Sequence, residues 1–364
     1  MPAILIFAIA LLLALPGPAH AEFELDTVAE GLDHPWSLAF LPEGGYLVTE
    51  RVGRLRRVSP EGELSEPIEG VPPAWVRSQG GLMGLALDPD YESNGWIYLT
   101  LAHGTAEANA TRLVRARLDG PRLVDLNVLF TARPTRDTPV HYGGRMAFLP
   151  DGTLLLTIGD GFDDREDAQS LESHTGSIVR LHRDGSAPAD NPWSGRSDAL
   201  PELYSIGHRN PQGIVLDPDS GRVWSHEHGP RGGDELNVIE AGVNYGWPVA
   251  TEGIDYSGAR VSPFTSRPGM RDPVLVWTPS IAPSGMVMVH GDRYPDWSGD
   301  LLITSLAERS LRRIDLDDGE VVGQERLELP LDERLRDVRV SPGGEIYLLT
   351  DSSDGRILRL RRTP

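Results

Sequence analysis

The sequence predicts an all-β protein, a six-bladed β-propeller with long loops over one face. Two observations predict this fold: one strand–turn–strand pattern recurs six times, and the 364 residues include 40 Gly and 30 Pro. Chains this rich in Gly and Pro turn often, so we expect no long helices. A hydrophobic content of 39% with a charged content of 24% is typical of a globular protein.

Each copy of the pattern joins an apolar strand to a second, alternating strand through a turn that contains Pro with Asp, Glu or Gly. Alternating Val, Ile, Leu, Tyr and Trp between Gly-rich turns is the signal of a β-hairpin. A third strand, often rich in Arg, follows each hairpin. The hairpins are expected at residues 38–49, 85–101, 146–158, 214–225, 286–304 and 338–350, and the third strands at 53–58, 112–118, 177–182, 235–240, 311–316 and 356–360.

Six sheets of three or four strands suit a propeller, because radial repetition protects the edges of the sheets. A solenoid or a pair of sandwiches is the alternative. Residues 22–29 read as a further strand, which we expect beside the last blade, closing the ring. Residues 22–364 are therefore predicted to form a single catalytic domain. Its surplus length lies in loops, where propellers build their sites, at residues 134–144, 159–176, 184–207 and 247–278.

The N-terminus reads as a targeting segment. An apolar run from Ile4 to Leu15 precedes Ala19-His20-Ala21, the pattern of a secretory signal peptide over residues 1–21. A buried N-terminal helix is the alternative. The run is too short to cross a bilayer, and no other stretch is apolar enough, so we expect no membrane span. The sequence predicts a periplasmic or secreted protein.

Composition excludes several kinds of chemistry. The chain has no Cys, and all 34 of its basic residues are Arg, which excludes thiol nucleophiles and Schiff-base catalysis by Lys. No Gly-x-Ser-x-Gly motif is present, which removes most hydrolases with a serine nucleophile. The net charge of −20 argues against a nucleic-acid partner, because phosphate binding needs a basic surface.

Polar clusters stand at equivalent positions, directly before the first strand of several repeats. Loops at equivalent positions of a propeller lie on one face around the central channel, so their side chains can converge. Several Arg at one channel mouth would bind a carboxylate or phosphate ligand. A further cluster, Gly159-Asp160-Gly161, follows the third hairpin. The side chains before the first strands are those of Gln79, His141, Arg209, Asn210, Arg334 and Arg336.

A second kind of polar segment leaves the fourth hairpin. The backbone carbonyls of Gly229-Pro230, with acidic residues nearby, suit Ca²⁺, which prefers oxygen ligands. A His can act as a general base. His, Arg and Ca²⁺ without a nucleophile suggest a cofactor that carries the difficult step, and composition does not name it.

At these loops the sequence resembles the pyrroloquinoline-quinone-dependent soluble glucose and aldose sugar dehydrogenases, often grouped with the sorbosone dehydrogenases. The resemblance covers residues 32–359, and members of that family are six-bladed propellers. The motifs that carry it are Gln79-Gly-Gly-Leu-Met-Gly, His141-x-Gly-Gly-Arg, Gly207-His-Arg-Asn-Pro-Gln-Gly, Gly229-Pro with Asp234-Glu-Leu-Asn, Asn244-Tyr-Gly-Trp-Pro, Ile281-Ala-Pro-Ser-Gly and Arg334-Leu-Arg-Asp.

The resemblance implies a role for each motif. His141 would take the proton of the anomeric hydroxyl, and the carbonyls of Gly229 and Pro230 would bind a Ca²⁺ at the quinone. A second Ca²⁺ would have Asp234, Glu235 and Asp255 as candidate ligands. The residues that would hold the cofactor are Gln79, Arg209, Asn210, Arg334 and Arg336.

Two positions depart from the pattern of the family's glucose dehydrogenases. Val140 stands where they have an Asp directly before the His, and Ala307 stands where they have a Lys that contacts the cofactor. The first departure bears on how His141 is oriented, and the second on cofactor affinity.

The sequence thus predicts a periplasmic quinoprotein dehydrogenase that oxidises aldose sugars at the anomeric carbon to lactones, with pyrroloquinoline quinone and Ca²⁺ as cofactors. The alternatives are a Ca²⁺-dependent propeller lactonase and a non-catalytic propeller binding module. The sequence identifies neither the preferred sugar nor the electron acceptor. It is compatible with a monomer or a homodimer.

Overall fold

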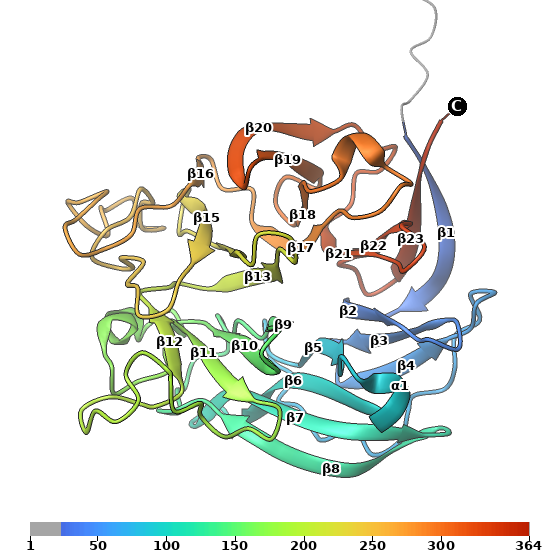
Figure 1. The fold of residues 1–364 in the computed structure, drawn as a ribbon, viewed down its shortest axis with the longest axis horizontal. Helices are drawn as coiled ribbons and strands as arrows, with labels where there is room; N and C mark the ends of the chain where they lie inside the picture. Colours follow the sequence, from blue (N-terminus) through green and yellow to red (C-terminus); the bar gives the residue numbers. More distant parts are fainter. Residues whose placement is uncertain (1–22, 364) are drawn as a thin grey trace, which may run out of the picture.

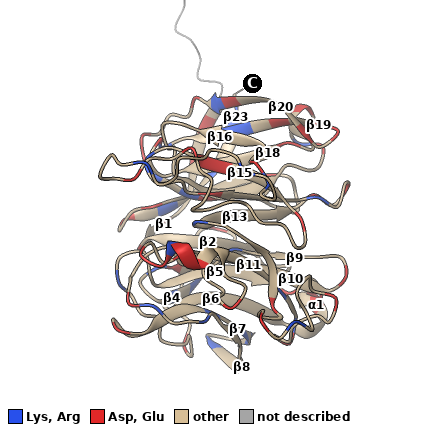
Figure 2. Ribbon diagram, turned by 90° about the vertical axis from the view of Figure 1, so that its left-hand side faces the viewer, with Lys and Arg blue, Asp and Glu red and all other residues tan. Residues whose placement is uncertain are grey.

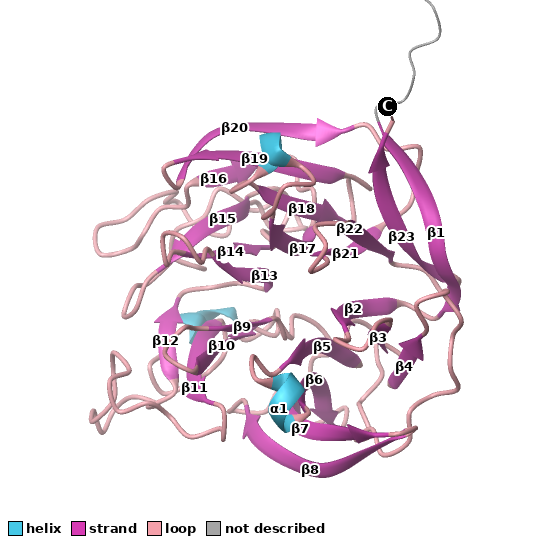
Figure 3. Ribbon diagram, turned by 45° about the vertical axis from the view of Figure 1, so that its right-hand side comes forward, coloured by secondary structure: helices cyan, strands magenta, loops and turns pink. Residues whose placement is uncertain are grey.

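The computed structural model describes residues 23–363, which form six antiparallel sheets around a central axis (Figure 1). The predicted signal peptide lies outside the described residues. Strands fill the ring, and helices are confined to short segments (Figure 3). The prediction of an all-β, six-bladed propeller is confirmed. The helical segments are α1 (Tyr91–Asn94) and the 3-10 turns Arg165–Gln169 and Pro295–Trp297.

The first three blades each begin with a predicted hairpin. Blade 1 has three strands, and blades 2 and 3 have four. Blade 1 contains β2 (Pro35–Phe40), β3 (Tyr46–Glu50) and β4 (Arg54–Val58); blade 2 contains β5 (Leu82–Leu87), β6 (Trp96–Gly104), β7 (Asn109–Asp119) and β8 (Arg122–Thr131); blade 3 contains β9 (Met146–Phe148), β10 (Thr153–Ile158), β11 (Ser177–His182) and β12 (Leu203–Ile206).

The last three blades have four strands each. Blade 4 contains β13 (Pro211–Leu216), β14 (Val223–Glu227), β15 (Asp234–Ile239) and β16 (Leu275–Trp277); blade 5 contains β17 (Pro283–Met288), β18 (Leu301–Ser305), β19 (Leu311–Asp317) and β20 (Glu320–Leu327); blade 6 contains β21 (Leu335–Val340), β22 (Ile346–Thr350), β23 (Gly355–Arg362) and β1 (Phe23–Leu32).

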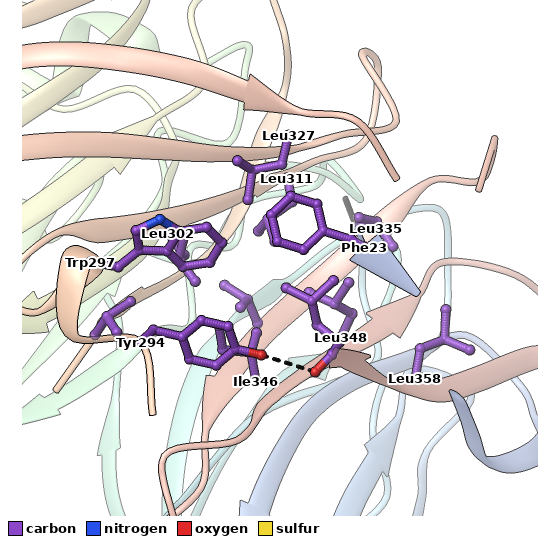
Figure 4. Packing of buried hydrophobic residues seen from close by; sticks show 13 residues of the cluster. Phe23, Tyr294, Trp297, Leu302, Leu311, Leu327, Leu335, Ile346, Leu348 and Leu358 are labelled. Atoms are coloured by element: carbon purple, nitrogen blue, oxygen red, sulfur yellow. Dashed lines mark hydrogen bonds between the residues drawn. The ribbon is translucent and has the colours of Figure 1, made fainter. Parts of the chain in front are cut away.

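The ring is closed by the two ends of the chain. Strand β1 pairs antiparallel with β23, from Phe23 opposite Arg362 to Leu32 opposite Gly355, and Figure 1 shows the two strands side by side. This confirms the predicted place of the first strand. The Phe23 ring also packs into the core between blades 5 and 6, with its centroid 5.6 Å from that of the Trp297 ring (Figure 4). The Tyr294 hydroxyl donates to the Leu360 carbonyl at 3.1 Å, and a dashed line marks this bond at Tyr294 in Figure 4.

Burial follows from the packing of blades against one another. Every residue of the second strands β3, β10, β14, β18 and β22 is buried, because each blade has a neighbouring blade on both faces. The outer strands instead carry mixed charges, as Figure 2 shows along β19, β20 and β23. Arg313 on β19, for example, pairs with Glu325 on β20 at 3.1 Å. The first strand of each blade lines the central channel and approaches the first strand of the next blade.

One side chain, that of Arg145, joins five blades at the channel. From the start of β9 its guanidinium donates to Asp337 Oδ1 at 2.8 Å and lies 3.9 Å from the centroid of the Trp36 ring. It also donates to three carbonyl oxygens in blades 4, 5 and 6, those of Gln212 at 2.8 Å, Ser284 at 3.0 Å and Arg336 at 3.1 Å. Burial lowers the pKa of Arg145 to about 10, so the side chain stays charged at neutral pH.

Candidate active site

A cavity of about 200 Å³ lies at the mouth of the central channel. Four of the predicted cofactor residues, Gln79, Asn210, Arg334 and Arg336, line it. The structure therefore brings together side chains that lie up to 257 positions apart, because each lies just before or at the start of the first strand of its blade. The cavity is also lined by Arg51 and Asp351, which sequence reasoning did not select, and by Trp36, Met83, Tyr142, Gly143, Gln212, His228, Ala282 and Leu306.

Three guanidinium groups surround one carboxylate in this cavity. Arg334 and Arg336 contact the same oxygen of Asp351, at 3.1 and 3.2 Å. Burial opposes ionisation of Asp351, but Arg336 and Arg334 lower its pKa to about 2. Burial lowers the pKa of Arg51, and the charges of Arg336 and Arg334 act in the same direction. The cluster keeps an excess of positive charge, which favours an anionic ligand.

The third arginine is fixed by close backbone packing. Arg51 follows β3 and donates from Nη1 to the Ser78 carbonyl at 2.8 Å. A Cβ atom at Gly81 would lie 1.9 Å from the Arg51 carbonyl oxygen, so only glycine allows this approach. Among the described residues, Nε of Arg336 is buried with no hydrogen-bond partner, which leaves a donor free at the cavity.

His141 lies beside the cavity with its imidazole ring held by Asp160. Nδ1 is 2.7 Å from Asp160 Oδ1, and Trp247 Nε1 donates to Asp160 Oδ2 at 2.7 Å. The imidazole and carboxylate are both buried. Burial opposes the charge of Asp160, but the hydrogen bond from His141 lowers its pKa. An ionised Asp160 can only accept, so Nδ1 carries the proton and Nε2 is free to accept one.

Asp160 orients His141, although the residue directly before the histidine is Val140 and not an Asp. The carboxylate that orients His141 comes from the Gly159-Asp160-Gly161 segment after β10, across the hairpin, rather than from the preceding residue. Gly159 is required here, because a Cβ atom would lie 2.0 Å from the His141 carbonyl oxygen. The sequence analysis found Asp160 as part of a polar cluster, but it did not show that the Asp160 carboxylate binds His141.

Two predicted cofactor residues also hold the loop that carries the histidine. Gln79 Oε1 accepts from the His141 backbone N–H at 2.9 Å, and Asn210 Oδ1 accepts from that of Gly143 at 3.2 Å. His141 has a φ of 54°, a conformation unusual for a residue with a side chain. The side-chain acceptors of Gln79 and Asn210 fix this conformation.

Arg209, the remaining predicted cofactor residue, lies outside the lining of this cavity. Its Nη1 donates to the carbonyl oxygens of His228 at 3.0 Å and Gly229 at 2.6 Å. Its backbone N–H bonds to the Glu227 carboxylate. Two carbonyl oxygens thus converge on one positive charge here. Carbonyl oxygens are also ligands that Ca²⁺ prefers.

The structure gives the three other candidate Ca²⁺ ligands separate surroundings. The Asp234 carboxylate accepts from Ser280 Oγ and from the backbone N–H groups of Gly229, Ile281 and Ala282, at 2.7 to 2.8 Å. Asp255 caps a turn through Ser257. The pKa of Glu235 is raised well above its usual range, mainly by burial and secondly by the nearby negative charge of Glu227. In residues 23–363, no group of three His, Asp or Glu is placed to hold a metal ion.

The segment around Ala307 contributes no cation to the lining of the cavity. Ala307 is exposed, and its neighbour Leu306 lines the cavity. Arg309, which could have replaced the missing Lys, pairs with Asp332 at 3.3 Å and does not line the cavity. The third guanidinium group of the cavity is that of Arg51.

Fold and site together define a propeller enzyme with a cationic cavity beside a buried His–Asp pair. The chain belongs to the glucose / sorbosone dehydrogenase family, whose pattern matches residues 32–359, and it is an oxidoreductase. It is 38% identical to the aldose sugar dehydrogenase YliI of Escherichia coli over 348 residues, which cover 94% of each protein.

Solved structures agree with this assignment. A glucose dehydrogenase with 42% identity superposes with a TM-score of 0.91, covering 93% of this chain and 100% of that chain. The aldose sugar dehydrogenase of Streptomyces coelicolor, solved in its PQQ-bound form, has 31% identity and a TM-score of 0.77, with 94% of this chain and 99% of that chain covered.

Proposed function

We propose that this protein oxidises aldose sugars at the anomeric carbon to lactones, with pyrroloquinoline quinone as its cofactor. The observation that carries the proposal is the position of the buried His141–Asp160 pair next to a cavity with three guanidinium groups and one carboxylate. The PQQ-bound relative supports the choice of cofactor.

The residues of the cavity fit this cofactor. Pyrroloquinoline quinone is a tricarboxylate, and guanidinium groups bind carboxylates through paired hydrogen bonds. Arg51, Arg334 and Arg336 would hold its carboxylates, with the free Nε of Arg336 as one donor. Gln79 and Asn210 would bind its other polar edge, and Arg209, outside the cavity lining, would contact a part of the cofactor that extends beyond the cavity. When bound, the cofactor supplies the acceptor for the hydride that leaves the sugar.

His141 is the proposed general base. Its Nε2 takes the proton of the anomeric hydroxyl while the bond from C1 to hydrogen breaks, so the hydroxyl oxygen becomes the carbonyl oxygen of the lactone. Asp160 holds the ring through Nδ1 and stabilises the imidazolium that forms. Trp247 holds the carboxylate in turn.

The proposal includes Ca²⁺ on the carbonyl oxygens of Gly229 and Pro230. Carbonyl oxygens are ligands that Ca²⁺ prefers. In this structure the Gly229 carbonyl accepts from Arg209 Nη1 at 2.6 Å, so the ion would share that oxygen with the guanidinium or displace it. Export to the periplasm or the cell exterior is proposed from residues 1–21. None of the helices in residues 23–363 has the length and apolar character needed to cross a bilayer.

The test is an assay of the purified protein with pyrroloquinoline quinone, Ca²⁺, glucose and a redox dye. We expect the dye to be bleached with formation of one lactone per sugar oxidised. Hydrolysis of an added lactone without the quinone would instead support a lactonase. Tight sugar binding with neither reaction would support a binding module.

Activity should persist to lower pH than an ordinary histidine would allow. Burial, the largest influence, lowers the pKa of His141, and Arg209 lowers it further, while Asp160 raises it. The base works only when neutral, so the acid limb of kcat/KM should lie below the unperturbed pKa of about 6.5. Asp160→Asn should move that limb to still lower pH, because it removes the group that stabilises the charged ring. A limb above 6.5 in the native enzyme would contradict this assignment.

Removal of Ca²⁺ with a chelator should abolish sugar oxidation and lower the melting temperature. A ligand that binds only the native state stabilises it, by about 2.7 kcal/mol at a hundred times its Kd. Differential scanning calorimetry and elemental analysis check both effects. Full activity in protein shown to be metal-free would refute the role of Ca²⁺.

Arg51→Ala should weaken the affinity of the apoprotein for pyrroloquinoline quinone by about 10–150-fold, the equivalent of one charge-assisted hydrogen bond. Fluorescence titration measures this without turnover. Arg309→Ala is the matched control, because that guanidinium pairs with Asp332 outside the cavity, and it should not change the affinity. Ala307→Lys should tighten binding if the added ammonium group reaches the cavity beside Leu306. Equal affinities in the wild type and Arg51→Ala would remove Arg51 from the cofactor site.

A further inference from the structure

Arg136 is a buried arginine without an acidic partner. It is 8% exposed, and within residues 23–363 its guanidinium forms no ion pair. Its one side-chain hydrogen bond to this part of the chain runs from Nη1 to the Gly159 carbonyl at 3.0 Å, and Nε and Nη2 are buried with no partner. Burying a guanidinium that is neither paired nor fully hydrogen-bonded is unfavourable. Such a group calls for an explanation, and charged groups in unusual surroundings cluster at functional sites.

The Arg136 side chain contacts both loops that carry the His141–Asp160 pair. Its guanidinium carbon lies 4.5 Å from the centroid of the Tyr142 ring. Its Nη1 donates to the Gly159 carbonyl. Tyr142 directly follows His141, and Gly159 directly precedes Asp160. One guanidinium therefore contacts a direct neighbour of each member of the pair.

The position of Arg136 is fixed by the backbone around it. Its N–H and C=O bond to the backbone of Asn109, at the start of β7, at 2.9 and 2.8 Å. Asn109 Oδ1 in turn accepts from the Tyr142 hydroxyl at 2.7 Å. A Cβ atom at Gly161 would lie 2.6 Å from Cδ of Arg136, so the side chain packs directly against the loop after β10. These contacts hold the guanidinium inside the protein.

The buried Asp160 carboxylate needs positive charge nearby. If His141 were the only source, the imidazole would hold a second proton, and an imidazolium has no lone pair with which to act as a base. Arg136 and Arg209 supply charge without titrating, because a guanidinium keeps its proton. Burial, the largest influence, and the charges of Arg209 and Arg136 lower the pKa of His141, while Asp160 raises it. His228, the other titratable group near His141, is uncharged, because burial lowers its pKa well below its usual range.

Arg136 acts on the pair through its charge. Burial lowers the pKa of Arg136, while Tyr142, Asp160 and Asp164 raise it. Asp160 nevertheless gives no hydrogen bond acceptor to Arg136, because its oxygens are already bound. Their donors are His141 Nδ1, Trp247 Nε1 and the backbone N–H of Phe162.

We propose that Arg136 is a positioning residue for His141: its guanidinium fixes the two loops that carry the His141–Asp160 pair and balances the charge of Asp160, which leaves the imidazole uncharged and able to accept a proton. Arg136 does not line the cavity, so it acts through His141 rather than on the sugar. This inference rests on the proposed function, in which His141 is the base.

The test measures the protonation of His141 without turnover. The intact protein, isotopically labelled at histidine, is titrated with acid and followed by NMR spectroscopy, and the resonance missing from His141→Gln identifies His141. In the wild type we expect a pKa below the unperturbed value of about 6.5. Arg136→Met and Arg136→Gln each remove the charge and should raise this pKa by about one pH unit. Gln keeps a donor for the Gly159 carbonyl, so it separates the loss of charge from the loss of that hydrogen bond.

Two further variants serve as controls. Arg136→Lys keeps a positive charge and should keep the pKa of His141 close to the wild-type value. Arg180→Met removes a mostly buried guanidinium from the same blade, beside Thr153 at the opposite end of β10 from Gly159, and should leave that pKa unchanged. Thermal melting verifies that each variant is folded. In the enzyme loaded with quinone and Ca²⁺, the acid limb of kcat/KM should move with the pKa measured by NMR.

An unchanged pKa of His141 in folded Arg136→Gln, or an equal rise in Arg136→Lys, would overturn the proposal, because the charge of Arg136 would then have no effect on the base. Absence of sugar oxidation by the wild type would count against the proposed function, while a raised pKa in the neutral variants would still support the link between Arg136 and His141. Sugar oxidation with an unmoved pKa would retain the proposed function and remove Arg136 from it.

Discussion

Replacing His141 by Gln is expected to lower the turnover number by roughly 10²–10⁴-fold. Gln keeps a donor for Asp160 but has no group that takes a proton from the anomeric hydroxyl. The effect falls on the transition state, so kcat and kcat/KM should fall together. Steady-state kinetics with saturating pyrroloquinoline quinone and Ca²⁺ measure both.

The matched control is His182→Gln, an exposed histidine at the end of β11 that makes the same chemical change away from the site. It should leave kcat unchanged. Quinone affinity in His141→Gln should stay close to that of the wild type, because His141 does not line the cavity. Turnover close to the wild-type value in His141→Gln would show that another group is the base.

Arg145→Met is expected to lower the free energy of unfolding by about 3–5 kcal/mol, because it removes one of the two guanidinium partners of the buried Asp337 carboxylate, the other being Arg339. The same change frees three carbonyl oxygens in blades 4, 5 and 6. Denaturant titration followed by tryptophan fluorescence measures the loss. Two of those carbonyls belong to cavity-lining residues, Gln212 and Arg336, so quinone affinity should fall as well.

An exposed ion pair provides the comparison. Arg196 pairs with Asp198 at 2.6 Å, and both side chains are at least half exposed, so Arg196→Ala should leave the denaturation midpoint close to that of the wild type. If Arg145→Met destabilised the protein no more than Arg196→Ala does, the channel contacts of Arg145 would have no special stabilising effect.

Local sequence patterns predicted most of the strands. The hairpins and third strands follow from alternation between turns, and the predicted strand at 177–182 coincides with β11 (Ser177–His182). The outer strands β8 and β20 were not predicted individually, because their exposed residues lack a regular apolar alternation. The short helix α1 was also missed, since four residues after a Pro-Asp turn carry no helical period.

The position of each loop within the repeat predicted which loops meet at the channel mouth. It identified only some of the side chains that form the site. Gln79, Asn210, Arg334 and Arg336 were found because they precede the first strands that the repeat predicted, although β21 (Leu335–Val340) begins early enough to include Arg336. Arg51, Asp160 and Asp351 come after second strands, directly or one residue later. Of these, only Asp160 was noted, as part of a polar cluster and without a partner. An antiparallel hairpin places the end of its second strand beside the start of its first, so both positions open onto the same channel mouth.

The sequence by itself determined the six repeats, the closing strand and the set of polar loops, because strand alternation and turn chemistry act between neighbouring residues. The tertiary structure alone decided the partners. Asp160 rather than a preceding residue orients His141, Arg51 rather than Arg309 joins Arg334 and Arg336, and Arg145 pairs with Asp337. These pairings join residues up to 285 positions apart, and their geometry is set by how the blades pack around the channel, which no local pattern records.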